Sequence, residues 1–220
     1  MKLKKIHLAA VAFSVSAGIS QAAVVFSGIA NNTGFTVDST TPLSIVNADV
    51  NGSGSWGLMD DGSFGATSSA DTFQIIGDAT ANGLLYKFTA GASTIGSISM
   101  YSGWNDNGRV EQHFSVYTTT DVSVTGASTW TLLTTVGGGG SNGSTQFAAA
   151  TDNSLKVTIY DNASATLASN VTGLRFNFGS DWQQNGQVGY KEIDVQVIPE
   201  PSAALLGGLG MLCLLRRRRA

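Results

Sequence analysis

The chain has 220 residues, of which 42% are hydrophobic and 12% are charged, and its formal net charge is −3. Basic residues gather at the two ends, so the part between them holds five Lys and Arg against fifteen Asp and Glu, a net charge of −10. This acidic balance argues against nucleic acid and anionic lipid as partners and is compatible with calcium or neutral glycans. Cys213 is the only cysteine, which leaves the body without disulfides or thiolate metal sites, so its stability must come from burial.

Residues 1–22 have the order of a secretory signal peptide. Lys2, Lys4 and Lys5 precede a mostly apolar stretch, which ends in small residues near position 22. That order of basic, apolar and small residues is typical of an export signal, and the apolar stretch is too short and too interrupted for a membrane anchor. We therefore expect the signal to be cleaved and the body to occupy residues 23–197.

An acidic turn comes early in the body, at Asp60-Asp61-Gly62. Clustered carboxylates and main-chain carbonyls on a tight loop are the oxygen ligands that calcium prefers. The same three residues are also favoured in turns without any metal, because Asp bonds to the nearby backbone and Gly accepts positive φ. Both interpretations stay open from the residues alone.

The body is predicted to be all β. In 154–161, "SLKVTIYD", apolar and polar residues alternate with the period of a half-buried strand. Clusters of Gly, Asn, Asp and Ser separate such runs and supply turns. Similar runs occupy 73–77, 84–89, 94–101, 110–120, 128–136, 173–178 and 189–198. Many short antiparallel strands without disulfides predict a single β-sandwich, of jelly-roll type.

Two polar loops contain tryptophan. Trp104 precedes Asn105 and Asp106 and a turn sequence, Asn-Gly, and Trp182 lies in "SDWQQNG". An aromatic ring can stack on a sugar while Asn and Asp bond its hydroxyl groups. Core packing is the competing explanation for any tryptophan. These four residues are the candidate glycan-binding set.

Catalytic signals are weak. His113 is the only histidine of the body, and it follows no recognisable nucleophile motif. We interpret it as a surface histidine and expect no enzymatic activity. A pair of carboxylates suited to glycoside hydrolysis could form from any two of the fifteen acids, and the sequence does not identify such a pair.

Three segments together resemble the galactose-binding-like jelly rolls, which include the discoidin-type modules: "LMDDGS" early, "WNDNGRVEQHF" leading to "STWTLL" in the middle, and "GYKEIDV" late. The resemblance implies an antiparallel sandwich and, in many members, a structural calcium ion held between early and late strands. It therefore implies Glu192 as the distant partner of Asp60 and Asp61 at a calcium site. Proteins of one fold can have unrelated functions, so the resemblance implies the fold more strongly than it implies a ligand.

The C-terminus, 198–220, has three parts. Pro199-Glu200-Pro201 is followed by fourteen uncharged residues, 202–215, and then by the basic cluster Arg216, Arg217, Arg218 and Arg219. As a helix the uncharged run would rise about 21 Å, short of the roughly 30 Å of a hydrocarbon core. The basic cluster should stay on the cytoplasmic side, which places the body outside and anchors it transiently in the inner membrane.

This order resembles the PEP-CTERM sorting signal of Gram-negative bacteria that make exopolysaccharide. The resemblance implies an exosortase as processing partner, with cleavage near the motif and a destination at the cell surface or outside the cell. Together with the acidic sandwich, it predicts a non-catalytic protein that binds or scaffolds extracellular polysaccharide. A self-associating structural protein of biofilm or envelope is the alternative, and a glycoside-active hydrolase ranks last.

Overall fold

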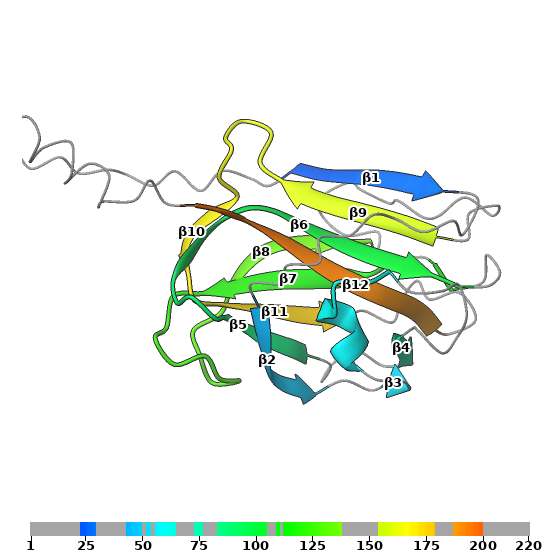
Figure 1. The fold of residues 1–220 in the computed structure, drawn as a ribbon, viewed down its shortest axis with the longest axis horizontal. Helices are drawn as coiled ribbons and strands as arrows, with labels where there is room; N and C mark the ends of the chain where they lie inside the picture. The colour runs from blue at the N-terminus through cyan, green and yellow to red at the C-terminus, as the bar shows by residue number, and fades with distance from the viewer. Residues whose placement is uncertain are drawn as a thin grey trace, which may run out of the picture.

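In a computed structural model, the described part of the chain is almost entirely β-strand (Figure 1). The structure describes residues 23–29, 43–49, 52–53, 56–64, 73–76, 83–104, 109–110, 112–137, 154–178 and 187–199. Its elements are β1 (Ala23–Ile29), β2 (Leu43–Asp49), β3 (Gly52–Ser53), the 3₁₀ helix η1 (Trp56–Asp60), β4 (Phe73–Ile76), β5 (Gly83–Phe88), β6 (Ser93–Gly103), β7 (Phe114–Thr119), β8 (Thr131–Val136), β9 (Ser154–Tyr160), β10 (Ala168–Val171), β11 (Gly173–Phe178) and β12 (Gln187–Ile198).

The strands form two antiparallel sheets. The seven-stranded sheet has the order β1-β9-β6-β12-β4-β3, with β10 paired to β6, and the five-stranded sheet has the order β2-β5-β11-β7-β8. Neighbours in each sheet are mostly distant in the sequence, as β6 beside β12 illustrates. The predicted antiparallel β-sandwich is confirmed, and this topology agrees with a jelly roll.

The core lies between the sheets because each strand buries alternate residues. In β9, Leu155, Val157 and Ile159 are buried, whereas the residues between them are partly exposed on the outer face. The five-stranded sheet contributes Leu174 and Phe176 to the same cluster. Burial of this apolar surface is the main favourable contribution to folding, about 25 cal/mol for each Å² removed from water.

Two predicted strands begin later than their sequence pattern indicates. The run predicted over 110–120 becomes a strand only at Phe114, because Gln112 turns inward and its Nε2 donates to the carbonyls of Met100 and Leu155, both at 3.1 Å. The run predicted over 128–136 becomes a strand only at Thr131. Before it, the Thr129 N–H donates to the Asp121 carboxylate at 2.7 Å, which stabilises a loop.

The central strand β12 changes character along its length. Between Tyr190 and Glu192 its register with β6 shifts, so that Lys191 is an extra residue in β12, as in a β-bulge. Residues 188–193 are all buried, which breaks the alternation seen in β9. The helix η1 packs against this start of β12, as Figure 1 shows in the cyan segment beside the wide tail of that strand.

The processed ends predicted from the sequence, 1–22 and 200–220, lie outside the described residues. The described part of the chain contains no helix long and apolar enough to cross a membrane. The last described residue, Pro199, follows β12 directly and is exposed.

Candidate functional site

The tryptophan of the first candidate glycan loop lies in the core. Trp104 follows the end of β6, is 7% exposed and belongs to the hydrophobic cluster. The guanidinium of Arg109 lies 4.4 Å from the centre of its ring. This cation–π contact joins the two sides of the loop and covers one face of the ring. Asn105, Asp106 and Trp182 lie outside the described residues.

The acidic turn after η1 meets the start of β12, across 130 residues of sequence. The Gly62 N–H donates to Glu192 Oε1 at 3.3 Å, and Gly62 has a φ of +75°. A glycine adopts this left-handed conformation without strain, which lets the turn point its amide at the strand. Glu192 is 1% exposed. The structure thus brings together the segments of Asp60, Asp61 and Glu192.

The environment of this acidic cluster disfavours negative charge. Burial raises the pKa of Glu192 to about 9; the Gly62 N–H lowers it, and the carboxylates of Asp61, Asp194 and Asp60 raise it again. Burial raises the pKa of Asp60 to about 6, with a further contribution from Asp61. Desolvation and like charge therefore act in the same direction on both acids.

Two buried oxygens beside the cluster have no hydrogen-bond partner among the described residues. They are Glu192 Oε2 and the hydroxyl of Tyr86. The pKa of Tyr86 is raised well above its ordinary value, first by burial and then by Asp60 and Glu192, so the three groups share one environment. Buried polar atoms are nearly always satisfied in native proteins, and this site therefore favours an added proton, a water molecule or a cation.

The cluster offers hard oxygen ligands and no soft ones. Among the described residues, no three Asp, Glu, His or Cys side chains already surround one point in the manner of a metal site. A calcium ion here would need main-chain carbonyls and water in addition to the carboxylates, which is usual for calcium. The unpartnered Glu192 Oε2 fits such an ion.

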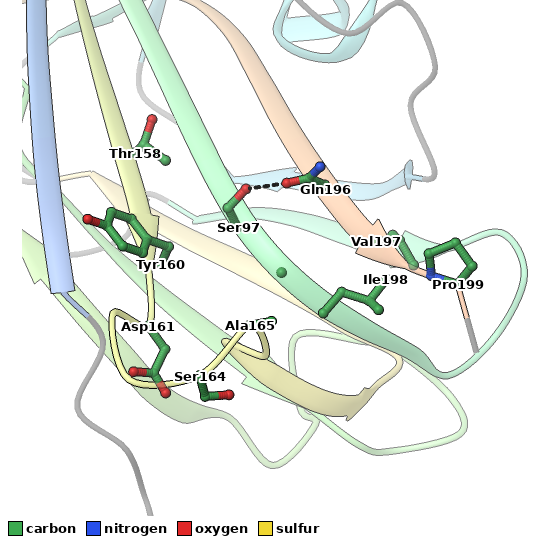
Figure 2. A pocket seen from close by; sticks show the side chains of 11 residues that line it. Ser97, Thr158, Tyr160, Asp161, Ser164, Ala165, Gln196, Val197, Ile198 and Pro199 are labelled. Carbon is green, nitrogen blue, oxygen red and sulfur yellow. Dashed lines mark hydrogen bonds between the residues drawn. The ribbon is translucent and has the colours of Figure 1, made fainter. Parts of the chain in front are cut away.

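Two cavities that were not predicted flank the loop 161–167, at the far end of the sandwich from Trp104. One has a volume of about 600 Å³ and lies over β6, β9 and the end of β12 (Figure 2). The other, of about 400 Å³, lies between this loop and β8. The sequence indicated the polar residues of the first cavity only as the residues that alternate with the buried ones and so point outward.

His113 lies just before β7 and is half-buried rather than exposed. Its N–H donates to the hydroxyl of Tyr190 at 3.1 Å, and its carbonyl accepts from the same hydroxyl at 3.2 Å. These main-chain bonds fix the start of β7 to β12. His113 therefore has a structural role through its main chain.

A family profile described as the PEP-CTERM protein-sorting motif matches residues 197–219. The chain carries this sorting signal. The resemblance predicted from Pro199-Glu200-Pro201 and the arginine cluster is confirmed, and the match begins inside β12, which ends at Ile198. No curated protein matches the chain significantly.

Solved structures with a similar fold include carbohydrate-binding domains of the CBM32 type. A structure of two CBM32 domains and a catalytic domain of ZmpB from Clostridium perfringens is 17% identical, with a TM-score of 0.50 over 82% of this chain and 17% of that one. A CBM32 domain from a family 31 glycoside hydrolase of the same organism is 17% identical, with a TM-score of 0.48 over 73% of this chain and 96% of that one. The first similarity agrees with the predicted galactose-binding-like fold.

Proposed function

We propose that this protein is exported, sorted by an exosortase to the cell surface or extracellular matrix, and binds extracellular polysaccharide without catalysing a reaction on it. Two observations together carry the proposal. A sorting motif matches residues 197–219 and begins in the last strand, and the sandwich that ends in this strand shares its fold with carbohydrate-binding domains. An acidic body without a thiolate or histidine cluster supports a binding role for neutral glycans.

In this proposal the polar loops after β6 and before β12 contact the glycan. Trp104 is only 7% exposed, so it would not touch the glycan itself. It would instead support the loop through its contact with Arg109. Direct contacts would come from Asn105, Asp106 and Trp182, whose amide, carboxylate and indole groups are the usual partners of sugar hydroxyls and ring faces.

The test is affinity electrophoresis of the exported protein, purified from the producing cells, in gels that contain the exopolysaccharide of those cells. We expect retardation, and Trp182→Ala should weaken it about tenfold because a stacking aromatic is a typical binding hot spot. Trp130→Ala, at the opposite end of the sandwich, is the matched control. Absence of retardation, with self-association instead, would favour a structural protein of the matrix.

The sorting proposal assigns the uncharged run 202–215 to transient anchoring in the inner membrane and the motif around Glu200 to exosortase recognition. Deletion of 216–219, or Glu200→Ala, should leave unprocessed protein in the membrane fraction. Intact mass measures this, since processing at both ends removes about the first 22 residues and the chain beyond the motif. Variants that are processed and exported like the natural chain would contradict the proposal.

We also propose that the acidic cluster holds a structural calcium ion, with Asp60, Asp61 and Glu192 as carboxylate ligands. The buried Glu192 Oε2 without a partner supports it. When bound, calcium would supply positive charge that offsets the burial of these acids and would link the turn after η1 to β12.

A further inference from the structure

We propose that a second saccharide-binding surface lies on the outer face of the seven-stranded sheet, at the exit end of β12. It is termed the outer-face groove and consists of Ser97, Thr158, Tyr160, Asp161, Ser164 and Gln196. This inference rests on the proposed polysaccharide binding and gives it a site remote from the tryptophan loops. Figure 2 shows these side chains on β6, β9, β12 and the loop that follows β9.

Strand register places the groove residues in rows across the sheet. Tyr160 lies opposite Ser97, and Ser97 lies opposite Gln196 on its other side. In the next row, Thr158 lies opposite Ser99. Residues directly opposite in antiparallel strands have side chains on the same face. Three strands that are far apart in the sequence therefore place these polar groups on one face, beside the apolar lining residues Val197, Ile198 and Pro199.

Hydrogen bonds within the groove hold its polar groups in place. The Ser97 hydroxyl donates to Gln196 Oε1 at 3.2 Å, so the Gln196 amide nitrogen keeps both of its protons for a ligand. The hydroxyls of Ser99 and Thr158 lie 3.0 Å apart and share a bond. Polar groups fixed in advance lose less entropy when a ligand binds.

Tyr160 provides an aromatic surface that the rest of the described chain leaves unused. Two other tyrosines are covered by cations: Lys156 Nζ lies 5.0 Å from the ring centre of the buried Tyr101, and the Arg175 guanidinium lies 5.9 Å from that of the half-buried Tyr117. No described residue stacks on Tyr160 or bonds to its hydroxyl. The cavity lining also includes the small residues Gly96 and Ala165, which leave space over the sheet. A sugar ring could therefore stack there.

The ligand class follows from charge and size. No basic side chain lines the cavity, and Asp161 is its one carboxylate. Phosphate, sulfate and uronate groups would lack a counter-charge here, whereas the hydroxyls of neutral sugars match the Ser, Thr and Gln groups. The volume of about 600 Å³ lies within the range of small-molecule sites. We therefore assign a short neutral segment of polysaccharide.

The test uses the exported protein and oligosaccharides released from the producing cells' exopolysaccharide, separated into neutral and anionic fractions. Tyr160→Ala should weaken binding of the neutral fraction about tenfold, because one stacking aromatic is lost. Tyr117→Ala is the matched control, a half-buried tyrosine on the outer face of the other sheet, and should bind normally. Gln196 is exposed, so Gln196→Ala should leave the fold intact. This variant should weaken binding about fivefold, because one hydrogen-bonding group is lost.

The outcomes separate this inference from the proposed function. Retardation of the natural chain that Trp182→Ala weakens and neither Tyr160→Ala nor Gln196→Ala changes would overturn the groove and leave polysaccharide binding intact. Selective binding of the anionic fraction would also overturn the groove as assigned. No binding of any fraction by the natural chain would overturn both. If Tyr160→Ala fails to fold, the Gln196→Ala result decides.

Discussion

The two ends of β12 differ in how their polar groups are satisfied. At its start, Glu192 is buried among other carboxylates, and one of its oxygens has no partner among the described residues. At its exit end, Gln196 is exposed and already accepts a hydrogen bond from Ser97. A buried unpaired charge costs several kcal/mol, whereas an exposed amide costs almost nothing. The first end therefore needs a proton, a water molecule or a cation at Glu192, whereas the second is suited to reversible binding.

A related difference separates two tyrosines, one on the outer face of each sheet. On the five-stranded sheet, Arg175 covers Tyr117 and its Nε donates to Asn177 at 2.7 Å. On the seven-stranded sheet, Tyr160 has no such cover from any described residue. Aromatic surface that the protein does not cover itself remains available to a partner.

The largest expected effect is a pH dependence that arises at the buried end. The pKa of Glu192 is about 9 in the folded protein against an ordinary 4.5. Below pH 4.5 both states hold this proton; as the pH rises towards 9 the unfolded chain alone releases it, so stability falls. In EDTA, the free energy of unfolding should therefore decrease from about pH 5 to pH 9, with a slope of at most about 1.4 kcal/mol per pH unit.

Urea unfolding across this pH range measures the slope. Glu192→Gln removes the titrating carboxyl, so above pH 6 the free energy of unfolding should become nearly independent of pH. Asp121→Asn, in an exposed loop, should leave the pH dependence unchanged. Asp60, whose pKa is about 6, adds a smaller loss of the same sign between about pH 4 and pH 6. A natural chain that is equally stable at pH 6 and pH 9 without metal would contradict a buried, titrating Glu192.

Added calcium should act at the start of β12, where the acidic cluster lies. Saturating calcium should stabilise the protein by about 2.7 kcal/mol at a concentration one hundred times its dissociation constant. Because a proton and calcium compete for Glu192, the affinity for calcium should increase as the pH rises towards 9, by up to about tenfold for each pH unit. Thermal unfolding with and without calcium at pH 6, 7 and 8 measures both effects. Equal melting temperatures at every pH would exclude the ion, and Glu192→Gln should abolish the response.

Sequence alone predicted the parts of the molecule that depend on local pattern. The alternation in 154–161 correctly predicted β9, because one buried face imposes a period of two. The strand β1, Ala23–Ile29, was not predicted, since its pattern is masked by the small residues that follow the signal peptide. The meeting of the acidic turn with Glu192, seen in the bond from Gly62, was anticipated only through a family resemblance, because no local rule joins segments 130 residues apart.

The outer-face groove shows the limit of such reasoning. The alternation in 154–161 predicts that Tyr160 lies on the face opposite to Val157 and Ile159, but its neighbour Ser97 is determined by strand pairing over a long separation in sequence. A one-residue slip in that register would move either side chain to the other face of the sheet. Site residues that come from three separate strands therefore become visible only when the sheet order is known.

The smallest expected effect comes from the hydroxyl pair at the exit end. Ser99→Ala and Thr158→Val each remove one partner of a 3.0 Å bond on the outer face. Thr158 is half-buried, so in Ser99→Ala water can replace its lost partner, and this variant should lose no more than about 1 kcal/mol of unfolding free energy. Thr158→Val leaves the Ser99 hydroxyl without its partner at 6% exposure, so it should lose more, about 2 kcal/mol. The double variant should cost less than the sum of the two, because removal of both partners leaves no orphan group. Urea unfolding of all four proteins gives this coupling. A loss of more than about 2 kcal/mol in Ser99→Ala would mean that the Thr158 hydroxyl is closed to water, and the contrast between the two ends of β12 would fail at the end where ligand binding is proposed.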